Sequence, residues 1–319
     1  MNVNLMNKVM SVARDLSDQA RSLSSIKVRW SDSWGPEYDH ALAALPEMPF
    51  CSHELYRKLA LNPTSVAKRF ALLSRRGEPI AIIGLRRRIA DWMFLTDGAV
   101  PWCTFPAKDG EQRASLAAIN TRIHSLQRVD PSVYGFRNVT PFSVYRADLT
   151  KDFERHWRNT DYYRTVKKAR SRTQGLCVRV DVPDDLTWVI RAWMDRWHDD
   201  PLQEFTIGPD NLLASHELLQ SGRMHVVALA DGDRLVGGMT LYVHENDVVM
   251  QIYAWDQSLA ELWLGTRVID AVFQWAASRG FHGFDLGGYH NYKRKWAPID
   301  GQRYASVCLL YTSPSPRDS

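Results

Sequence analysis

The chain has 319 residues, of which 45% are apolar and 24% are charged, and its formal net charge is +4. This composition fits a folded protein of one or two domains and excludes a disordered or fibrous chain. With so small a net charge, nucleic-acid binding would have to rest on local patches rather than on the overall balance.

Membrane, secretory and metal-binding signals are absent from the sequence. No apolar run approaches the length of about 18 residues that a transmembrane helix needs, and the N-terminus lacks a continuous apolar signal segment. The four cysteines form no C-x-x-C pair, and the ten histidines have no metal-ligand spacing. We therefore expect a cytoplasmic protein with reduced, buried thiols and no metal.

The first half of the chain predicts an amphipathic helix over 5–24, which packs on its own domain or serves as a partner or membrane-surface helix. Gly77, Glu78 and Pro79 lie between two apolar runs and predict a hairpin turn. The other predicted elements are a strand over 26–30, helices over 36–45 and 52–61, strands over 68–76, 80–88 and 91–98, a helix over 110–127, and strands over 133–139 and 142–149.

The second half predicts a similar succession of elements. These are helices over 150–159 and 161–173, a strand over 176–182, helices over 183–197 and 210–221, strands over 224–232, 234–245 and 247–256, a helix over 259–279, and a strand over 283–288. This order indicates an α+β fold with mixed, mostly antiparallel sheets flanked by helices. The predicted divisions are an N-terminal helix (1–25), two related domains (26–149 and 150–308) and a tail (309–319).

Four stretches carry a family resemblance: PEMPFCSHELYRKLA, DYYRTVKKARSRTQGLCVRV, LGTRVIDAVFQWAASRGFHGFDLGG and NYKRKWAP. Together with the order of elements, they resemble the GNAT (acyl-CoA N-acyltransferase) fold and, more closely, the tandem-GNAT proteins of the FemAB type. The resemblance implies an enzyme that moves an acetyl or aminoacyl group to an amino group. Its acceptor would be a small-molecule or lipid-linked sugar or peptide precursor of the cell envelope, peptidoglycan or a polysaccharide.

The resemblance also implies catalytic residues. Lys293 takes the position of the lysine in the aromatic-Lys motif, where a cation stabilises the oxyanion formed during acyl transfer; a solvated basic loop is the alternative. Asp285 would orient Lys293, accept a proton or, slightly favoured, cap the following turn. Tyr289 and Tyr292 would donate a proton to the leaving group or stack on the substrate.

The donor would enter at a strand end marked by Trp255. Its pyrophosphate would lie at the start of the next helix, near Gly265, Thr266 and Arg267, because helix N-termini bind anions. The usual GNAT glycine-rich pattern is reduced here to Gly265 and Arg267. The donor is therefore either acetyl-CoA or, as in several FemAB-type proteins, an aminoacyl-tRNA.

Arg164, Lys167 and Lys168 form one face of the basic helix over 161–173. This face would bind tRNA or the diphosphate of a nucleotide-linked or lipid-linked precursor, or be merely solvated. A non-catalytic module that binds nucleic acid or an anionic polymer through this helix is the alternative function.

The tail LLYTSPSPRDS is rich in Ser and Pro and resembles the translation of a sequencing adapter. We expect it to be non-native and the strand before it to be cut short.

Overall fold

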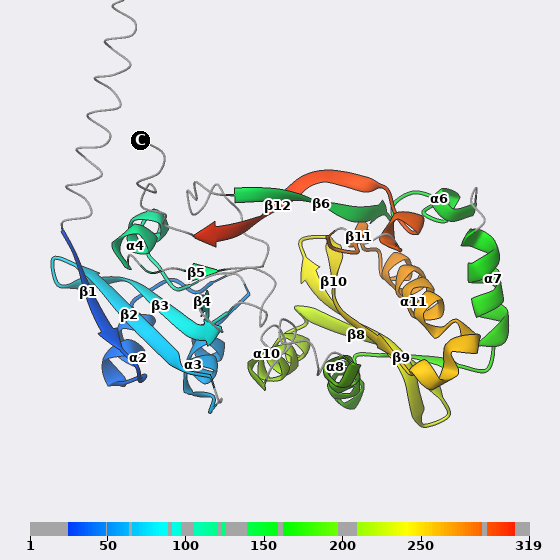
Figure 1. The fold of residues 1–319 in the computed structure, drawn as a ribbon, viewed down its shortest axis with the longest axis horizontal. Helices are drawn as coiled ribbons and strands as arrows, with labels where there is room; N and C mark the ends of the chain where they lie inside the picture. Colours follow the sequence, from blue (N-terminus) through cyan, green and yellow to red (C-terminus); the bar gives the residue numbers. More distant parts are fainter. Residues whose placement is uncertain are drawn as a thin grey trace, which may run out of the picture.

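A computed structural model gives the three-dimensional structure (Figure 1). It describes residues 25–48, 50–63, 66–88, 91–96, 105–119, 121, 123–124, 139–158, 162–196, 209–288 and 292–309. The predicted helix over 5–24 and the tail after residue 309 lie outside these residues, as does most of the strand predicted over 133–139.

The described elements alternate between strands and helices. In the first half they are β1 (Ile26–Ser31), α2 (Pro36–Ala43), α3 (His53–Leu61), β2 (Lys68–Arg75), β3 (Glu78–Arg88), β4 (Asp91–Phe94), α4 (Gln112–Ile119), β5 (Ile123–His124) and β6 (Val139–Asp148). In the second half they are α6 (Arg155–Arg158), α7 (Tyr162–Arg172), β7 (Cys177–Val180), α8 (Pro183–Arg196), α10 (Pro209–Gln220), β8 (Met224–Asp231), β9 (Arg234–His244), β10 (Asp247–Trp255), α11 (Leu264–Ser278), β11 (Gly283–Asp285) and β12 (Ile299–Leu309), with 3-10 turns η1 (Gln257–Leu262) and η2 (Lys293–Lys295).

The predicted α+β class is confirmed, but three predicted helices are wrong in extent. The helix expected over 150–159 begins only at Arg155, in the short α6. The helix expected over 110–127 ends at Ile119, and the short strand β5 follows it. The helix expected over 259–279 is interrupted at Trp263, whose φ of 59° is left-handed. This conformation separates η1 from α11, so the regular helix begins at Leu264.

All strands join one 12-stranded sheet in the order β1-β2-β3-β4-β5-β12-β6-β11-β10-β9-β8-β7. The order consists of two matching series that meet at the β12–β6 pair, and each half contains the last strand of the other (Figure 1). The boundary predicted near residue 150 follows β6 in the chain, yet β6 pairs with β11 and β12. The described strands therefore form one continuous sheet, and the division of the chain into two domains remains a proposal.

Three buried apolar clusters hold the layers together. One joins α2 and α3 to α8, α10 and one face of β8–β10, so it extends across both halves. A second packs α7 and α11 against the opposite face of β8–β10 and includes β11. The third packs α4 against β2, β3 and β4. No helix of the described residues is long and apolar enough to cross a membrane.

A buried ion pair crosses the short strand β11. Arg146 on β6 donates two hydrogen bonds of 2.7 Å to the carboxylate of Asp247 on β10. Gly283 of β11 lies beneath this pair, and a Cβ atom there would be 2.3 Å from Arg146 Nη2 and 2.5 Å from Asp247 Oδ1. A glycine at 283 is therefore needed for the pair to form.

Replacing Gly283 should break this ion pair. We expect Gly283→Ala and Asp247→Ala each to lower the free energy of unfolding by about 2–3 kcal/mol, because each leaves a mostly buried charge without its partner. The double variant should lose much less than the sum, since both changes remove the same interaction. Urea unfolding measures this, with Gly175→Ala as the control, because a Cβ at Gly175 meets nothing within 4 Å. Additive losses would contradict the shared cause.

Candidate functional site

The two parallel strands β10 and β11 form a fork. They pair at three positions, from Asp247 opposite Gly283 to Val249 opposite Asp285. β11 ends at Asp285, whereas β10 continues to Trp255. The edge of β10 that follows Val249 is therefore not paired with β11.

A β-bulge at Gln251 sets which side chains face the fork. Met250 pairs with Leu241 and Ile252 pairs with Thr240, so Gln251 is the extra residue. After the bulge, Tyr253 packs with the α11 cluster, whereas Ile252 packs with the α8 cluster. In a strand without the bulge, Tyr253 would face α8 and Ile252 would face α11, because side chains alternate along a strand.

Aromatic rings line the open end of the fork. The ring centroids of Tyr253 and Trp255 are 4.6 Å apart, and those of Tyr253 and Tyr292 are 6.5 Å apart and nearly parallel. Arg196, the last residue of α8, places its Cζ atom 4.4 Å from the centroid of the Trp255 ring. The predicted donor residue Trp255 and the predicted catalytic residue Tyr292 thus belong to one aromatic group.

The first turn of α11 lies against this group. A Cβ atom on Gly265 would be 2.6 Å from the hydroxyl oxygen of Tyr253, so glycine allows a close approach. The hydroxyl groups of Tyr162 and Thr266 are 3.3 Å apart. Leu264, Gly265 and Thr266 occupy the turn in which backbone N–H groups have no partner within the helix. Those groups are suited to an anion.

Lys293 begins η2 and is 5% exposed, which is unusual for a lysine. Its Nζ atom lies 5.8 Å from the centroid of the Tyr292 ring. The buried Asp285 accepts a 2.6 Å hydrogen bond from the backbone N–H of Gly287. This bond is the one expected of a turn-capping aspartate.

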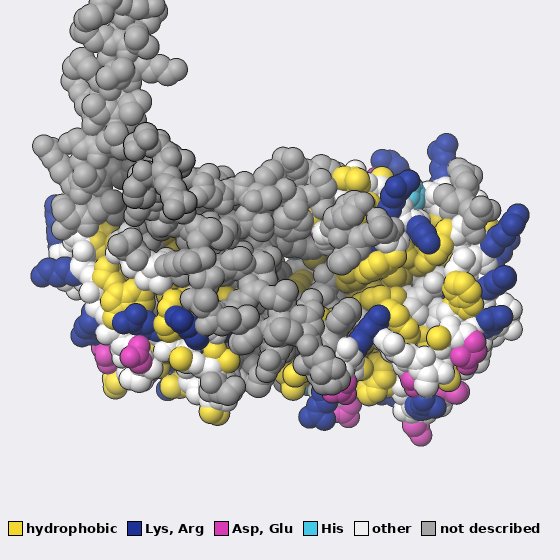
Figure 2. All heavy atoms as spheres, viewed as in Figure 1, with side chains coloured by type: hydrophobic (Ala, Val, Ile, Leu, Met, Phe, Trp, Pro, Cys, Tyr) yellow, Lys and Arg dark blue, Asp and Glu magenta, His cyan; other side chains and the backbone are white. Residues whose placement is uncertain are grey.

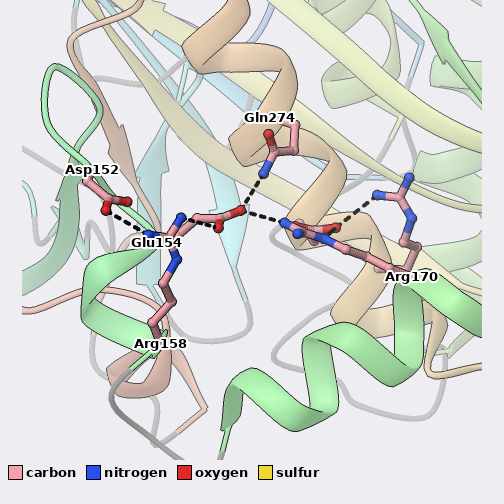
Figure 3. Close-up of polar contacts among 7 residues, drawn as sticks. Asp152, Glu154, Arg158, Arg170 and Gln274 are labelled. Atoms are coloured by element: carbon pink, nitrogen blue, oxygen red, sulfur yellow. Dashed lines mark hydrogen bonds and ion pairs between the residues drawn. The ribbon is translucent and has the colours of Figure 1, made fainter.

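The side chain of Arg267 contacts Asp270, whereas the other predicted donor residues lie at the aromatic group. It donates a 3.2 Å hydrogen bond to Asp270, which is 1% exposed and also pairs with Arg170 of α7. Arg170 in turn contacts Glu154, so the network ties α6, α7 and α11 together (Figure 3). An open hollow of about 510 Å³ lies beside it, lined by Arg170, Val178, Arg267, Asp270, Ala271, Gln274, Trp275 and Ser278.

The network sets the charge of its members. Burial is the largest single influence on Glu154 and favours its neutral form, but hydrogen bonds from Arg170, Arg158 and Gln274 together outweigh it and lower the pKa. The hydrogen bond to Asp270 is the main cause that raises the pKa of Arg170. The lowered pKa of Glu154 and the raised pKa of Arg170 keep both groups charged near neutral pH, so we interpret the network as structural.

The predicted substrate residues Arg164, Lys167 and Lys168 are exposed on α7. The Nζ atom of Lys167 lies 4.6 Å from the centroid of the Tyr163 ring. Figure 2 shows Lys and Arg side chains along the edge of the molecule where Figure 1 places α6 and α7. Tyr289, the remaining predicted substrate residue, lies outside the described residues.

Three residues of this region were not among the predicted site residues: Tyr162, Arg196 and Lys295. The Nζ atom of Lys295 lies 5.2 Å from the centroid of the Tyr162 ring, which also packs on Trp296. No local pattern sets Tyr162 apart from the rest of its helix, and nothing in the sequence places the end of α8 beside β10. Contacts between distant segments reveal these residues.

The tyrosines of the fork stay protonated over a wide pH range. Burial raises the pKa of Tyr292 to about 12 and that of Tyr253 well above its usual value, while Arg196 opposes both shifts. Burial also raises the pKa of Tyr162. These hydroxyl groups therefore keep their protons near neutral pH.

Other predicted features of the site concern metals and thiols. Among the described residues, no group of three or more His, Cys, Asp or Glu side chains is placed to hold a metal ion. Of the thiols, Cys51 is buried as expected, but Cys177 on the edge strand β7 is exposed, which contradicts the expectation for that residue.

The comparisons with known proteins identify the class of the second half. Residues 157–294, somewhat less than half of the chain, match the family model described as an acetyltransferase (GNAT) domain. This part of the chain is therefore similar to a GNAT domain, and the fold is GNAT-like, with mixed sheets flanked by helices. No curated protein matches the chain.

Several solved structures are similar in fold. The C-terminal domain of a putative lysylphosphatidylglycerol synthetase from Agrobacterium fabrum has a TM-score of 0.44 and 16% identity, over 71% of this chain and 79% of that one. FemX has a TM-score of 0.47 and 9% identity, over 87% and 96%. L-PGS from Bacillus licheniformis has a TM-score of 0.46 and 12% identity, over 81% and 77%. Likenesses this weak give no information on the substrate.

The contact between Gly265 and Tyr253 leads to a rescue experiment. Gly265→Ala should lower the midpoint of thermal unfolding, although alanine favours helix by about 1 kcal/mol over glycine, because its methyl group meets the Tyr253 hydroxyl. Tyr253→Phe in the same chain should restore the midpoint, since it removes the atom that clashes. A destabilised double variant would show that the contact is not the cause.

The raised pKa of Tyr292 predicts alkaline destabilisation. An unfolded chain loses the tyrosine proton near pH 10.0, whereas the folded chain keeps it to about pH 12. Between these values the unfolded state binds fewer protons, so stability falls as pH rises. In urea unfolding, Tyr292→Phe should show a smaller fall over this range than wild type, and Tyr163→Phe serves as the control. An identical fall in wild type and Tyr292→Phe would exclude Tyr292 as its source.

Proposed function

We propose that the protein is an N-acyltransferase of the FemAB type that moves an acetyl or aminoacyl group to an amino group of a cell-envelope or polysaccharide precursor. The observation that carries this proposal is that pairing between β10 and β11 stops at Val249 and that Tyr253, Trp255 and Tyr292 gather beyond it. The buried Lys293 follows Tyr292 directly, and the whole region lies inside the segment that matches the GNAT family model. The proposed acceptor is a small or lipid-linked sugar or peptide. We place the reaction in the cytoplasm, where both candidate donors are made.

The fork offers an acyl donor two kinds of contact. The edge of β10 after Val249 can pair with an extended donor arm that carries amide groups, as a strand pairs with a sheet edge. The first turn of α11, at Gly265 and Thr266, supplies backbone N–H groups for a phosphate. These features fit acetyl-CoA. Arg267 does not fit the phosphate role expected of it, because Asp270 already holds it.

The reaction needs one bond to form and one to break. The neutral amine attacks the acyl carbonyl carbon, the carbonyl oxygen becomes negative, and the bond to the donor's sulfur or ester oxygen then breaks. The proposed role of Lys293 is to stabilise the negative oxygen, which is favoured in a site largely removed from water. Tyr292 donates a proton to the leaving group, and the attacking amine releases one proton.

The α7 face gives the donor or acceptor a place for its phosphates. Arg164, Lys167 and Lys168 are exposed and can bind a diphosphate or the backbone of an aminoacyl-tRNA. The same exposure favours the second candidate function, a binding module for nucleic acid or an anionic polymer that performs no transfer. The two functions differ in whether Lys293 matters.

Replacing Lys293 tests the enzyme. Lys293→Met should lower turnover by roughly 10²–10³-fold with the fold retained, because it removes the charge that meets the oxyanion but keeps most of the side-chain volume. The assay follows labelled acetyl-CoA or charged tRNA with cell-envelope precursors as acceptors. The exposed neighbour Arg294→Ala is the matched control and should keep its activity.

Full turnover by Lys293→Met would remove the catalytic assignment. Salt-dependent binding of a polyanion that is lost when Arg164, Lys167 and Lys168 are replaced, with no transfer by wild type, would favour the binding module.

A further inference from the structure

The bulge of β10 is held by a group of side-chain hydrogen bonds, which we call the bulge clamp and which consists of Thr240, Tyr242 and Gln251. Thr240 Oγ1 donates to Gln251 Oε1 at 2.9 Å and accepts from the backbone N–H of Ile252 at 3.1 Å. Gln251 Nε2 donates to the hydroxyl oxygen of Tyr242 at 2.5 Å. Thr240 and Tyr242 both lie on β9, so the clamp joins the extra residue of β10 to its neighbouring strand.

The clamp is specific to the bulged register, and two of its three residues are buried while Gln251 is half-buried. Thr240 has 0% exposure and Tyr242 has 5%. In a regular ladder the N–H of Ile252 would need a backbone partner, but here the hydroxyl of Thr240 takes that place. These polar groups therefore bond to one another in this register, and a slip to the regular register would break the bonds of Thr240 to Gln251 and to the N–H of Ile252.

The position of the bulge explains both special features of the fork. Pairing between β10 and β11 stops at Val249, two residues before Gln251, and a bulge bends the strand that carries it. The same extra residue turns Tyr253 and Trp255 toward α11 and Tyr292. Without it, both rings would point to the α8 side of the sheet.

We propose that Gln251 and Thr240 are positioning residues of the acyl-donor site, which hold the bulge and thereby keep the fork open and its aromatic wall in place. This inference rests on the proposed function, because it assigns a purpose to the same fork. Neither residue touches the reacting atoms: each acts through the direction of Tyr253 and Trp255.

Thr240→Val is the sharpest test, because it removes the hydroxyl group and keeps the shape of the side chain. We expect a 10- to 100-fold loss of turnover, the size that small misplacements of a site produce. Thr240→Ser should restore most of the activity, since it returns the hydroxyl. Thr187→Val is the matched control. Thr187 of α8 hydrogen-bonds with Pro183 of the same helix and with His216 of α10, away from the fork.

A spectroscopic arm separates positioning from stability. We expect the close, tilted contact of the Tyr253 and Trp255 rings, whose centroids are 4.6 Å apart, to give a near-ultraviolet circular dichroism component, measured as the difference between wild type and Trp255→Phe. Thr240→Val should lose this component at temperatures where far-ultraviolet signals show a fully folded chain, and Thr240→Ser should keep it.

A folded Thr240→Val variant with the component and the turnover of wild type would overturn the inference. If wild type transfers no acyl group to any acceptor, the proposed function fails, but the spectroscopic arm still decides whether the clamp directs the two rings.

Discussion

The Arg146–Asp247 ion pair fixes the closed end of the β10–β11 fork, and the candidate site depends on it. β11 has three residues, too few to hold a position by its own ladder. It is held because β6 and β10 flank it and are themselves joined across Gly283. Beyond this fixed end, β11 stops at Asp285 while β10, bulged at Gln251, continues alone to Trp255.

The exchange of last strands makes the site a property of the whole sheet. β6 belongs to the first half of the chain, yet it supplies the neighbour of β11 and the arginine that crosses it. The walls then come from other distant segments: Tyr162 from α7, Arg196 from α8 and Tyr292 from the segment before η2. Loss of packing between the halves would therefore disturb the fork as well as the fold.

The sequence indicated part of the site because some of its signals are local. Trp255 ends an apolar strand, Gly265 follows at the start of a helix, and Tyr292 and Lys293 stand in an aromatic-Lys motif, so their proximity followed from the order of elements. Arg267 was assigned to the donor because it occupies the same turn, but the buried carboxylate of Asp270, one turn further, holds it. Tyr162 and Arg196 were missed because only packing brings them to the fork.

The sequence by itself determined the α+β class and most elements of both halves, because hydrophobic periodicity, caps and turns act over a few neighbouring residues. It also predicted the apolar strand over 247–256, which is β10, before the helix that corresponds to α11. The tertiary structure decided the exchange of β6 and β12, the left-handed break at Trp263 and the bulge at Gln251. The exchange of β6 and β12 arises from pairing between segments far apart in the chain, and the bulge from hydrogen bonds between neighbouring strands. A local pattern cannot encode which partner a strand edge will meet.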